Sequence, residues 1–307
     1  MNKRILCFII SLIAIVSTAV QGFGTELKIV YNAREDFTST QGANLWRYQY
    51  MTAAGNYESY TDMTWNGTKY VYKDQNDNVW NNINSTVIQP GPWGSNSAYV
   101  WIAPYSGTVK LTCVGNVRKQ NVGNDTTAII TKTNAVCKEP AVLWEKMIVG
   151  TDRTGTGNTY DIELEIKANE RLYFEVKVGS PTSAETAWTP IVTYTQVAAF
   201  EQNGEKILDA SQVTDGADLT CTLYDKNAIT ENANIYAAVF DNEGYMRAIS
   251  DAWFADVMSW TDRKAEMTLP MNFGAESYDG WQVKIFAVSA QSDRRYPFNI
   301  SESICIK

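Results

Sequence analysis

The sequence of 307 residues contains no histidine. This absence excludes the commonest general base, the Ser-His and Cys-His nucleophile pairs, and the commonest ligand of zinc. Any catalysis would have to use carboxylates, Tyr or Lys bases, or calcium. Basic residues are fewer than acidic ones, and the formal charge is −8 at pH 7. An acidic surface repels nucleic acid and anionic lipid, so we expect neither as a partner.

Long apolar runs are absent except near the start of the chain. A secretory signal has a basic start, an apolar centre and small residues at the cleavage site. Residues 1–24 show all three in order: Lys3 and Arg4, then 5–16, then Ala19 and Gly22. The apolar run is shorter than the roughly 20 residues that span a bilayer, so a retained anchor is the weaker alternative. We therefore expect a secreted, periplasmic or cell-surface protein with no membrane span after signal cleavage.

Cysteines are few as well, with five in the chain. Cys7 falls inside the predicted signal and is removed with it. The other cysteines form two local pairs, Cys113 with Cys137 and Cys221 with Cys305. An even number of cysteines in an exported chain favours disulfides within each domain. We favour the Cys221–Cys305 bridge and leave the first pair open, because free buried thiols are the alternative.

Hydrophobic residues alternate with a period of two, and no segment has the length and pattern of an amphipathic helix. The clearest stretch, residues 160–178, predicts a β-hairpin with one buried face and a turn at 168–170. Further strands are predicted at 28–31, 98–102, 109–114, 128–132, 190–195, 219–224, 234–240 and 282–288. Frequent Gly, Asn and Pro turns separate them, which is typical of β-sandwiches.

The mature chain of about 285 residues is long enough for two domains. An aromatic-rich region ends near residue 198, and the remaining segment has roughly the hundred residues of an immunoglobulin-like sandwich. The prediction is an all-β protein with two β-sandwich domains, residues 25–198 and 199–307.

The first predicted domain combines tryptophans with asparagines in turn-like, polar surroundings. The apolar face of a sugar ring packs on an aromatic ring, and amide side chains pair with its hydroxyls. Loops carry binding surfaces more often than cores do. The candidate carbohydrate-binding residues are therefore Trp65, Trp80, Trp93, Asn66 and Asn81.

Other aromatic residues of this region have a different pattern. Trp46, Tyr48 and Tyr50 occupy every second position and share one face of a strand. This alternation favours a place in the core over a place in an exposed platform.

Four segments in order resemble a carbohydrate-binding-like jelly-roll module of large secreted bacterial proteins that degrade polysaccharides. They are DFTSTQGANLWRYQY (36–50), VIQPGPWGSNSAYVWIAPYSGTVKLT (87–112), LWEKMI (143–148) and ERLYFEVKVGS (170–180). The resemblance implies a jelly-roll-like sandwich without catalytic activity. The chain departs from the pattern in the extra stretch 134–140, which carries Cys137.

The second region resembles an immunoglobulin-like or fibronectin-like accessory module of bacterial surface and carbohydrate-active proteins. The matching segments are IYAAVFDNEGYMRAIS (235–250), MTLPMNF (267–273) and WQVKIFAVSA (281–290). The resemblance implies a spacer or docking unit.

Two alternative sites involve carboxylates. Asp161, Glu163 and Glu165 occupy every second position and resemble the acid and nucleophile array of jelly-roll glucanases. Ordinary solvent-facing positions explain them equally well. Asp152 and Asn158 lie in a glycine-rich loop that could bind a structural calcium ion, although the loop lacks the spaced carboxylates of a calcium loop. We expect no cofactor, apart from this structural calcium, and no enzymatic activity.

The sequence thus predicts an exported protein that binds a polysaccharide or glycan without cleaving it. The alternatives are a structural or adhesive subunit that binds a surface protein, and a glycosidase that uses Asp161, Glu163 and Glu165.

Overall fold

The computed structural model describes residues 28–52, 56–73, 79–92, 94–178, 184–208, 210–225, 233–253, 264–289 and 297–298. The predicted signal peptide, Trp93 and Cys305 lie outside this part of the chain. Strands dominate it, and its helices are short 3₁₀ turns: Ala43–Leu45 (η1), Tyr57–Ser59 (η2) and Ala210–Gln212 (η3). No helix within these residues is long and apolar enough to cross a membrane. The predicted all-β class is confirmed.

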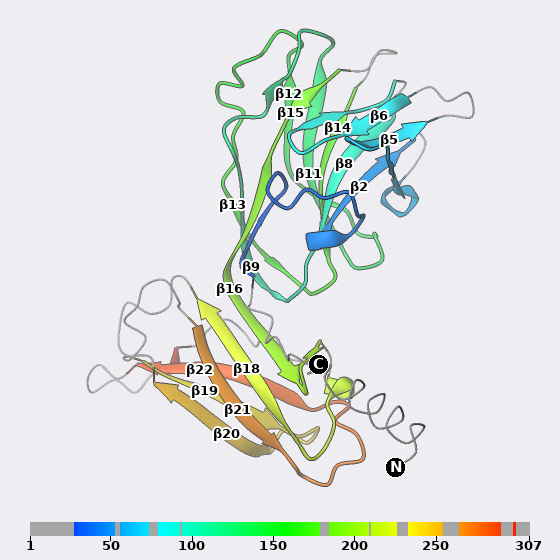
Figure 1. The fold of residues 1–307 in the computed structure, drawn as a ribbon. Coiled ribbons are helices and arrows are strands. Elements are labelled where there is room, and N and C mark those ends of the chain that lie inside the picture. The colour runs from blue at the N-terminus through cyan, green and yellow to red at the C-terminus, as the bar shows by residue number, and fades with distance from the viewer. Residues whose placement is uncertain are drawn as a thin grey trace, which may run out of the picture.

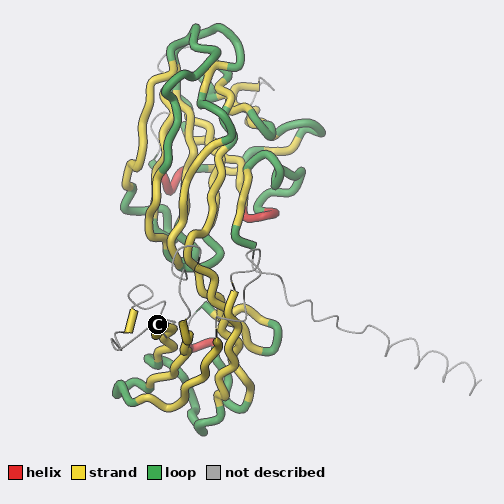
Figure 2. The backbone as a smooth tube through the Cα atoms, turned by 90° about the vertical axis from the view of Figure 1, so that its left-hand side faces the viewer, coloured by secondary structure: helices red, strands yellow, loops and turns green. Residues whose placement is uncertain are grey.

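The strands form two lobes that are joined by one long strand, β16 (Figures 1 and 2). The first lobe contains two sheets of its own. Its first sheet has the order β12 (Ala141–Ile148), β11 (Thr126–Thr133), β14 (Arg171–Lys177), β8 (Asn96–Ile102), β2 (Trp46–Met51) and β3 (Thr61–Asp62). Its second sheet has the order β10 (Arg118–Lys119), β15 (Thr186–Ala187), β7 (Val87–Gln89), β6 (Val79–Ile83), β5 (Tyr70–Lys73) and β4 (Thr64–Trp65).

A third sheet is shared by both lobes. It has the order β13 (Ile162–Ile166), β9 (Gly107–Cys113), β16 (Pro190–Gln202), β18 (Ala217–Asp225) and β21 (Lys264–Met271), with β1 (Val30–Asn32) and β17 (Glu205–Ile207) also paired to β16. A fourth sheet completes the second lobe, in the order β20 (Met246–Trp253), β19 (Ala233–Phe240), β22 (Gln282–Ser289) and β23 (Pro297–Phe298).

The strand β16 serves both lobes because its two halves have different partners. Residues 190–197 pair with β9, and residues 196–202 pair with β18. Val197 packs in the core of the first lobe, whereas Ala198 and Phe200 pack in the core of the second. Residue 198, where the sequence suggests a domain boundary, therefore lies inside a continuous strand.

A polar and aromatic contact bridges the lobes beside β16. Lys206 on β17 donates a hydrogen bond to the carbonyl of Pro104, and its ammonium lies 3.8 Å from the centre of the Tyr105 ring. The Tyr194 hydroxyl on β16 donates to the Tyr105 carbonyl at 2.6 Å. The Lys206 contacts hold the β8–β9 loop against the second lobe, and the Tyr194 hydrogen bond fixes the same loop within the first lobe.

The first lobe has an aromatic core between its sheets. Trp46, Trp101 and Phe174 are fully buried there, from β2, β8 and β14. Burial of such large apolar side chains provides most of the stabilising free energy of the lobe. The strand prediction for 98–102 matches β8 closely.

The hairpin predicted over residues 160–178 is wrong. Both of its strands exist, as β13 and β14, but β13 pairs with β9 in the shared sheet and β14 pairs with β11 and β8 in the first sheet. Ile166 and Leu172 face the same core from opposite sheets. Alternation reports only which side chains are buried, and it is the same for a hairpin and for a connection that crosses between two sheets.

No disulfide is present in the described part of the chain. Cys113, Cys137 and Cys221 are free thiols, and the partner predicted for Cys221 lies outside the described residues. Cys113 packs against the core of the first lobe. Cys137 instead accepts a hydrogen bond at 3.4 Å from Tyr173, whose side chain lies on the outer face of the first sheet. The first pair of thiols is thus kept apart by the sheet.

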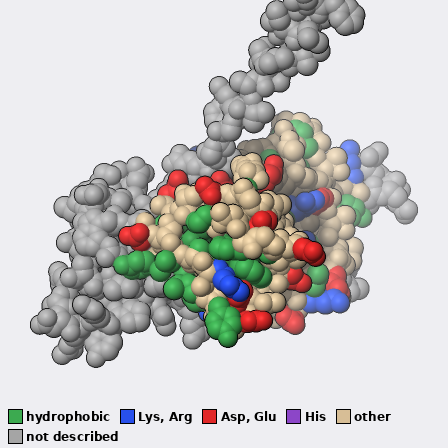
Figure 3. All heavy atoms as spheres, turned by 90° about the horizontal axis from the view of Figure 1, so that it is seen from below, with side chains coloured by type: hydrophobic (Ala, Val, Ile, Leu, Met, Phe, Trp, Pro, Cys, Tyr) green, Lys and Arg blue, Asp and Glu red, His purple; other side chains and the backbone are tan. Residues whose placement is uncertain are grey.

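The second lobe encloses its own core between the shared and fourth sheets. Leu219, Leu269 and Val239 are among its buried residues. Seen from below, this lobe presents hydrophobic side chains among charged ones (Figure 3). Tyr245 and Met246, at the start of β20, are 64% and 54% exposed.

Candidate functional site

A cleft of ≈ 520 Å³ opens at the edge of the first lobe. It lies where two edge strands meet, β3 of the first sheet and β4 of the second sheet. Its walls are formed by Tyr50, Asp62, Thr64, Trp65, Asn66, Val71, Tyr72 and Lys73. Its volume is within the range of small-molecule binding pockets.

The aromatic wall of the cleft continues a ladder of stacked tyrosines. Tyr48 on β2 and Tyr70 on β5 stack with ring centres 4.3 Å apart, and both are buried. One step outward on the same strands, Tyr50 and Tyr72 stack at 3.9 Å and are half-buried. Because side chains two residues apart share a strand face, the buried pair supports the pair at the rim. Burial, and then the neighbouring Tyr72, raise the pKa of Tyr50.

Trp65 completes the aromatic surface from the second sheet. Its ring centre lies 5.3 Å from that of Tyr70, and it also packs against Phe37. It is half-buried, so part of its ring faces solvent. The rings of Trp65, Tyr50 and Tyr72 therefore supply the apolar surface of the cleft wall.

Asp62 is a carboxylate held in a fixed position at the cleft. Its Oδ1 accepts hydrogen bonds from Arg47 Nε at 3.0 Å and from Gln49 Nε2 at 2.7 Å. Its Oδ2 pairs with the same guanidinium. Partial burial alone would raise the pKa of Asp62, but the hydrogen bonds from Arg47 and Gln49 outweigh it and lower the pKa. The carboxylate is thus ionised at neutral pH.

Asn66 begins the tight turn between β4 and β5. Its Oδ1 accepts hydrogen bonds from the Thr68 amide, the Thr68 hydroxyl and the Lys69 amide, at 3.0–3.2 Å. Gly67 in this turn has φ +104°, a conformation that favours glycine. Since the Oδ1 atom is occupied, the Nδ2 group of Asn66 is what remains to donate to a ligand.

The structure brings together two of the five predicted carbohydrate-binding residues, Trp65 and Asn66. Trp80 occupies the bulge of β6 opposite Tyr72 and Lys73, so its backbone lies one strand away from the cleft wall. Trp93 lies outside the described residues.

Asn81 does not belong to an exposed surface, contrary to the sequence prediction. Its side chain is 0% exposed, and its Nδ2 donates to Ser97 Oγ at 2.9 Å and to the Asn96 carbonyl at 3.1 Å. Its Oδ1 accepts from Ser95 Oγ at 3.2 Å. The amide ties the second sheet to the first, and a buried amide needs such partners.

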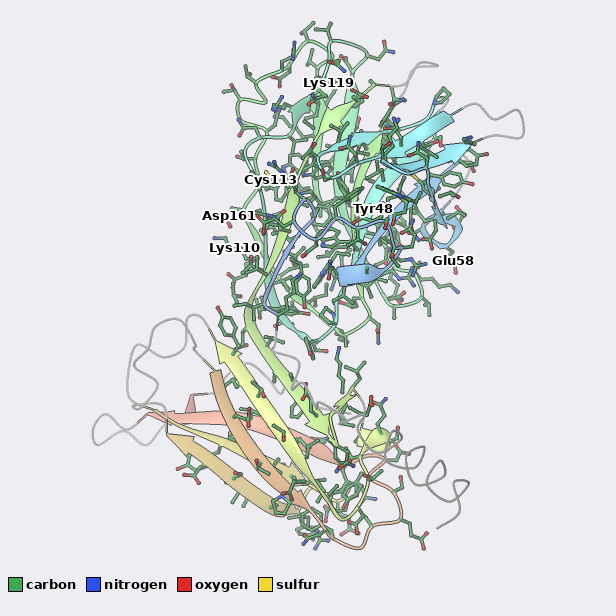
Figure 4. The ribbon with its side chains drawn as sticks, viewed as in Figure 1. Tyr48, Glu58, Lys110, Cys113, Lys119 and Asp161 are labelled. Carbon is green, nitrogen blue, oxygen red and sulfur yellow. The ribbon has the colours of Figure 1, made fainter. Side chains whose placement is uncertain are left out.

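The carboxylate row of the glycosidase alternative lies elsewhere. Glu163 and Glu165 are exposed on β13, an edge of the shared sheet, and Asp161 is exposed just before it. Asp161 forms an ion pair with Lys110 at 2.9 Å, at the left edge of the first lobe in Figure 4. The pairing with Lys110 is typical of a solvated sheet face.

The glycine-rich loop brings Asp152 and Asn158 together, as a calcium site would require. Asp152 Oδ2 accepts from Asn158 Nδ2 at 2.8 Å, and Oδ1 accepts from the amides of Thr154 and Gly155. The Gly155 amide and other loop donors lower the pKa of Asp152. The carboxylate therefore closes the loop by accepting hydrogen bonds.

A smaller hollow of ≈ 250 Å³ lies at the far end of the first lobe. It is lined by Gln89, Asn121, Val122, Gly123, Ala184 and Glu185, with no aromatic side chain. Asn121 Nδ2 already donates to Glu185 at 2.7 Å. The chemistry of this hollow differs from that of the larger cleft.

Sequence reasoning missed Tyr50, Tyr72 and Asp62. Tyr50 belongs to an alternating row that favours a core position, and the row is indeed buried at Trp46 and Tyr48. The last member of such a row reaches the rim of the sandwich, where the strand ends. That end position is the signal that could have identified Tyr50.

No protein-family model and no curated protein matches this sequence. Three solved structures are similar to this chain at low sequence identity. The adhesin domain of Epf from Streptococcus pyogenes is 10% identical, with 89% of this chain and 97% of that chain covered and a TM-score of 0.35. A β-glucuronidase from Bacteroides uniformis is 7% identical, with 85% of this chain and 30% of that chain covered and a TM-score of 0.23. A glycosyl hydrolase family 2 member from Bacteroides cellulosilyticus is 8% identical, with 81% of this chain and 33% of that chain covered and a TM-score of 0.24. All three TM-scores are below 0.5, so these proteins indicate nothing about a ligand of this chain.

Proposed function

We propose that the protein binds a carbohydrate in the cleft of the first lobe and does not cleave it. The observation that carries the proposal is the composition of the cleft walls. Three half-buried aromatic side chains, Tyr50, Trp65 and Tyr72, lie next to the polar groups of Asp62 and Asn66. A sugar ring needs an apolar surface for its C–H face together with donors and acceptors for its hydroxyls.

The polar groups of the cleft complement each other in hydrogen bonding. Asp62 offers acceptors only, the Nδ2 group of Asn66 offers donors only, and the Thr64 hydroxyl offers both. Each sugar hydroxyl is itself a donor and an acceptor, so one ligand can satisfy all three groups. Among the described residues, Asp62 is the only carboxylate that lines the cleft, and it is paired with Arg47. Most glycosidases need two carboxyl groups at the site. A cleft wall with one carboxylate therefore supports binding without catalysis.

In this proposal the protein acts outside the cytoplasm, as its predicted signal peptide implies. The second lobe then supports the first through β16 and the Lys206 contact. A rigid junction would hold the cleft at a fixed position relative to whatever carries the second lobe.

The proposal is tested with a glycan array and a pull-down on insoluble polysaccharides, using the mature chain. We expect wild type to bind at least one sugar, and Trp65→Ala and Tyr72→Ala to lose about tenfold or more in affinity, since a stacked ring contributes about 1–3 kcal/mol in comparable aromatic contacts. Tyr245→Ala, which removes an aromatic side chain that is 64% exposed on the second lobe, is the matched control. No sugar binding by wild type, together with binding to a surface protein, would favour the adhesive alternative instead.

A further inference from the structure

The cleft is lined by one charged group of each sign. Among the described residues that line it, Asp62 is the one acidic group and Lys73 the one basic group. Lys73 takes part in another interaction. Arg47 stands behind Asp62, with 34% of its side chain exposed, and does not line the cleft. Asp62 is therefore the acidic group of the cleft wall, and the guanidinium that it pairs with does not line the cleft.

Asp62 has one hydrogen-bonding position left for a ligand. A carboxylate has about four lone-pair sites on its two oxygens. Oδ1 uses both of its sites for Arg47 and Gln49, and Oδ2 uses one site for Arg47. The remaining site on Oδ2 can accept one hydrogen bond, and the side chain is 31% exposed. Only a ligand group that donates a hydrogen can use this site.

We propose that Asp62 makes the cleft selective for uncharged sugars and excludes uronates and sulfated sugars. This inference rests on the proposed function and adds the chemical class of the ligand. A neutral sugar donates a hydroxyl hydrogen to the free site of Asp62. A ligand carboxylate or sulfate placed at this site is ionised at neutral pH and has acceptors only, so it leaves the site unpaired and is repelled by the carboxylate.

The fixed position of Asp62 sharpens this selection. Arg47 and Gln49 hold both oxygens, so the carboxylate cannot turn away from an anionic ligand without breaking those hydrogen bonds. The same hydrogen bonds lower its pKa, so the negative charge remains on mild acidification. We therefore expect selectivity at pH 5 as well as at pH 7.

The experiment compares matched ligands on the mature protein by isothermal titration. The probes are trisaccharides of glucose, galactose and mannose, each paired with the uronate trisaccharide of the same linkage. Wild type should bind at least one neutral member about tenfold or more tightly than its uronate partner. Raising the salt concentration from about 0.05 M to about 0.5 M should reduce this ratio, because the repulsion is screened.

Two variants test the role of Asp62 in opposite directions. Asp62→Asn removes the carboxylate and leaves Arg47 without its ion pair, so the preference should disappear or reverse. Arg47→Met removes the counter-ion, while Gln49 still holds Oδ1 of Asp62. The site becomes more negative, so the preference for neutral sugars should increase. Glu163→Gln is the matched control, because it removes one exposed carboxylate on β13, across the lobe from β5 and β6 (Figure 1), and should leave the ratio unchanged.

Different outcomes overturn different claims. Equal or tighter binding of a uronate by wild type overturns the charge selection while the carbohydrate-binding proposal stands. An unchanged ratio in Asp62→Asn, or a lower ratio in Arg47→Met, also overturns it. If Asp62→Asn binds no probe at all, the Arg47→Met ratio decides the matter. Absence of binding of every probe and every array sugar to wild type overturns the proposed function, and this inference with it.

Discussion

Lys119 is a buried ammonium in the first lobe and makes a quantitative prediction possible. Its side chain is 0% exposed at the end of β10, near the top of the lobe in Figure 4. Among the described residues its Nζ donates to Thr126 Oγ1 at 3.4 Å. Burial lowers the pKa of Lys119 from 10.5 to about 8, and the carboxylates of Asp125 and Glu185 oppose this only in part.

The lowered pKa means that folding is penalised while Lys119 is charged. A shift from 10.5 to about 8 corresponds to about 3 kcal/mol, since one pKa unit is 1.36 kcal/mol. Below pH 8 both the folded and the unfolded chain carry the proton, and the full penalty applies. Between about pH 8 and 10.5 the unfolded chain binds more protons than the folded chain. The contribution of Lys119 to the free energy of unfolding must therefore rise with pH in this window.

The perturbation is Lys119→Met, which keeps a similar aliphatic stem without the charge. We expect this variant to be about 2–3 kcal/mol more stable than wild type at pH 7. The difference should shrink by about 2 kcal/mol between pH 7 and pH 9.5, because wild type loses its penalty as Lys119 deprotonates. Tyrosine ionisation in the unfolded chain has its midpoint near pH 10, and because it affects wild type and variant alike it cancels from the difference.

The assay is urea unfolding followed by tryptophan fluorescence at several pH values between 7 and 9.5. Lys167→Met is the control, since Lys167 is exposed after β13, and it should follow wild type at every pH. Parallel pH profiles for wild type and Lys119→Met would refute the reasoning. So would a Lys119→Met variant that is less stable than wild type at pH 7.

Three further predictions concern other parts of the chain. Wild type should release no reducing ends from any polysaccharide that it binds, and release that vanishes in Glu163→Gln would refute the non-catalytic proposal. Gly107→Ala should lower the free energy of unfolding by about 1–3 kcal/mol in urea titrations. The added Cβ would lie 2.3 Å from the Gln196 carbonyl oxygen, so the backbone would have to move. Unchanged stability would contradict the close approach of β9 and β16. Peptide mapping of the alkylated, unreduced protein should find Cys113 and Cys137 in separate peptides, and a linked peptide would show that the two sheets are arranged differently.

The strands of this protein could be predicted from alternation, but their pairing could not. The prediction at 282–288 matches β22, and the predicted strands at 160–178 correspond to β13 and β14. Alternation records the burial of each side chain against a core. It does not record which sheet supplies the strand, and the chain between Ile166 and Leu172 crosses from the shared sheet to the first sheet.

The candidate site could be predicted in part for a similar reason. Trp65 and Asn66 stand next to a tight turn, and turn chemistry is local, so the sequence shows it directly. Tyr50 and Tyr72 form their stack across two sheets from positions far apart in the chain. Whether such a residue lies in the core or at the rim depends on where both strands end. The burial of Asn81 has the same origin, because its partners come from β8 and the turn before it.

The central claim is that a sugar binds between Trp65 and Tyr72. The most direct measurement is a crystal structure of the mature protein with the oligosaccharide that gives the strongest signal on the array. We predict a sugar ring packed against Trp65 or the stacked pair of Tyr50 and Tyr72, with one hydroxyl donating to Asp62. A sugar bound in the hollow beside Glu185, or on the second lobe, with the cleft empty, would contradict the account.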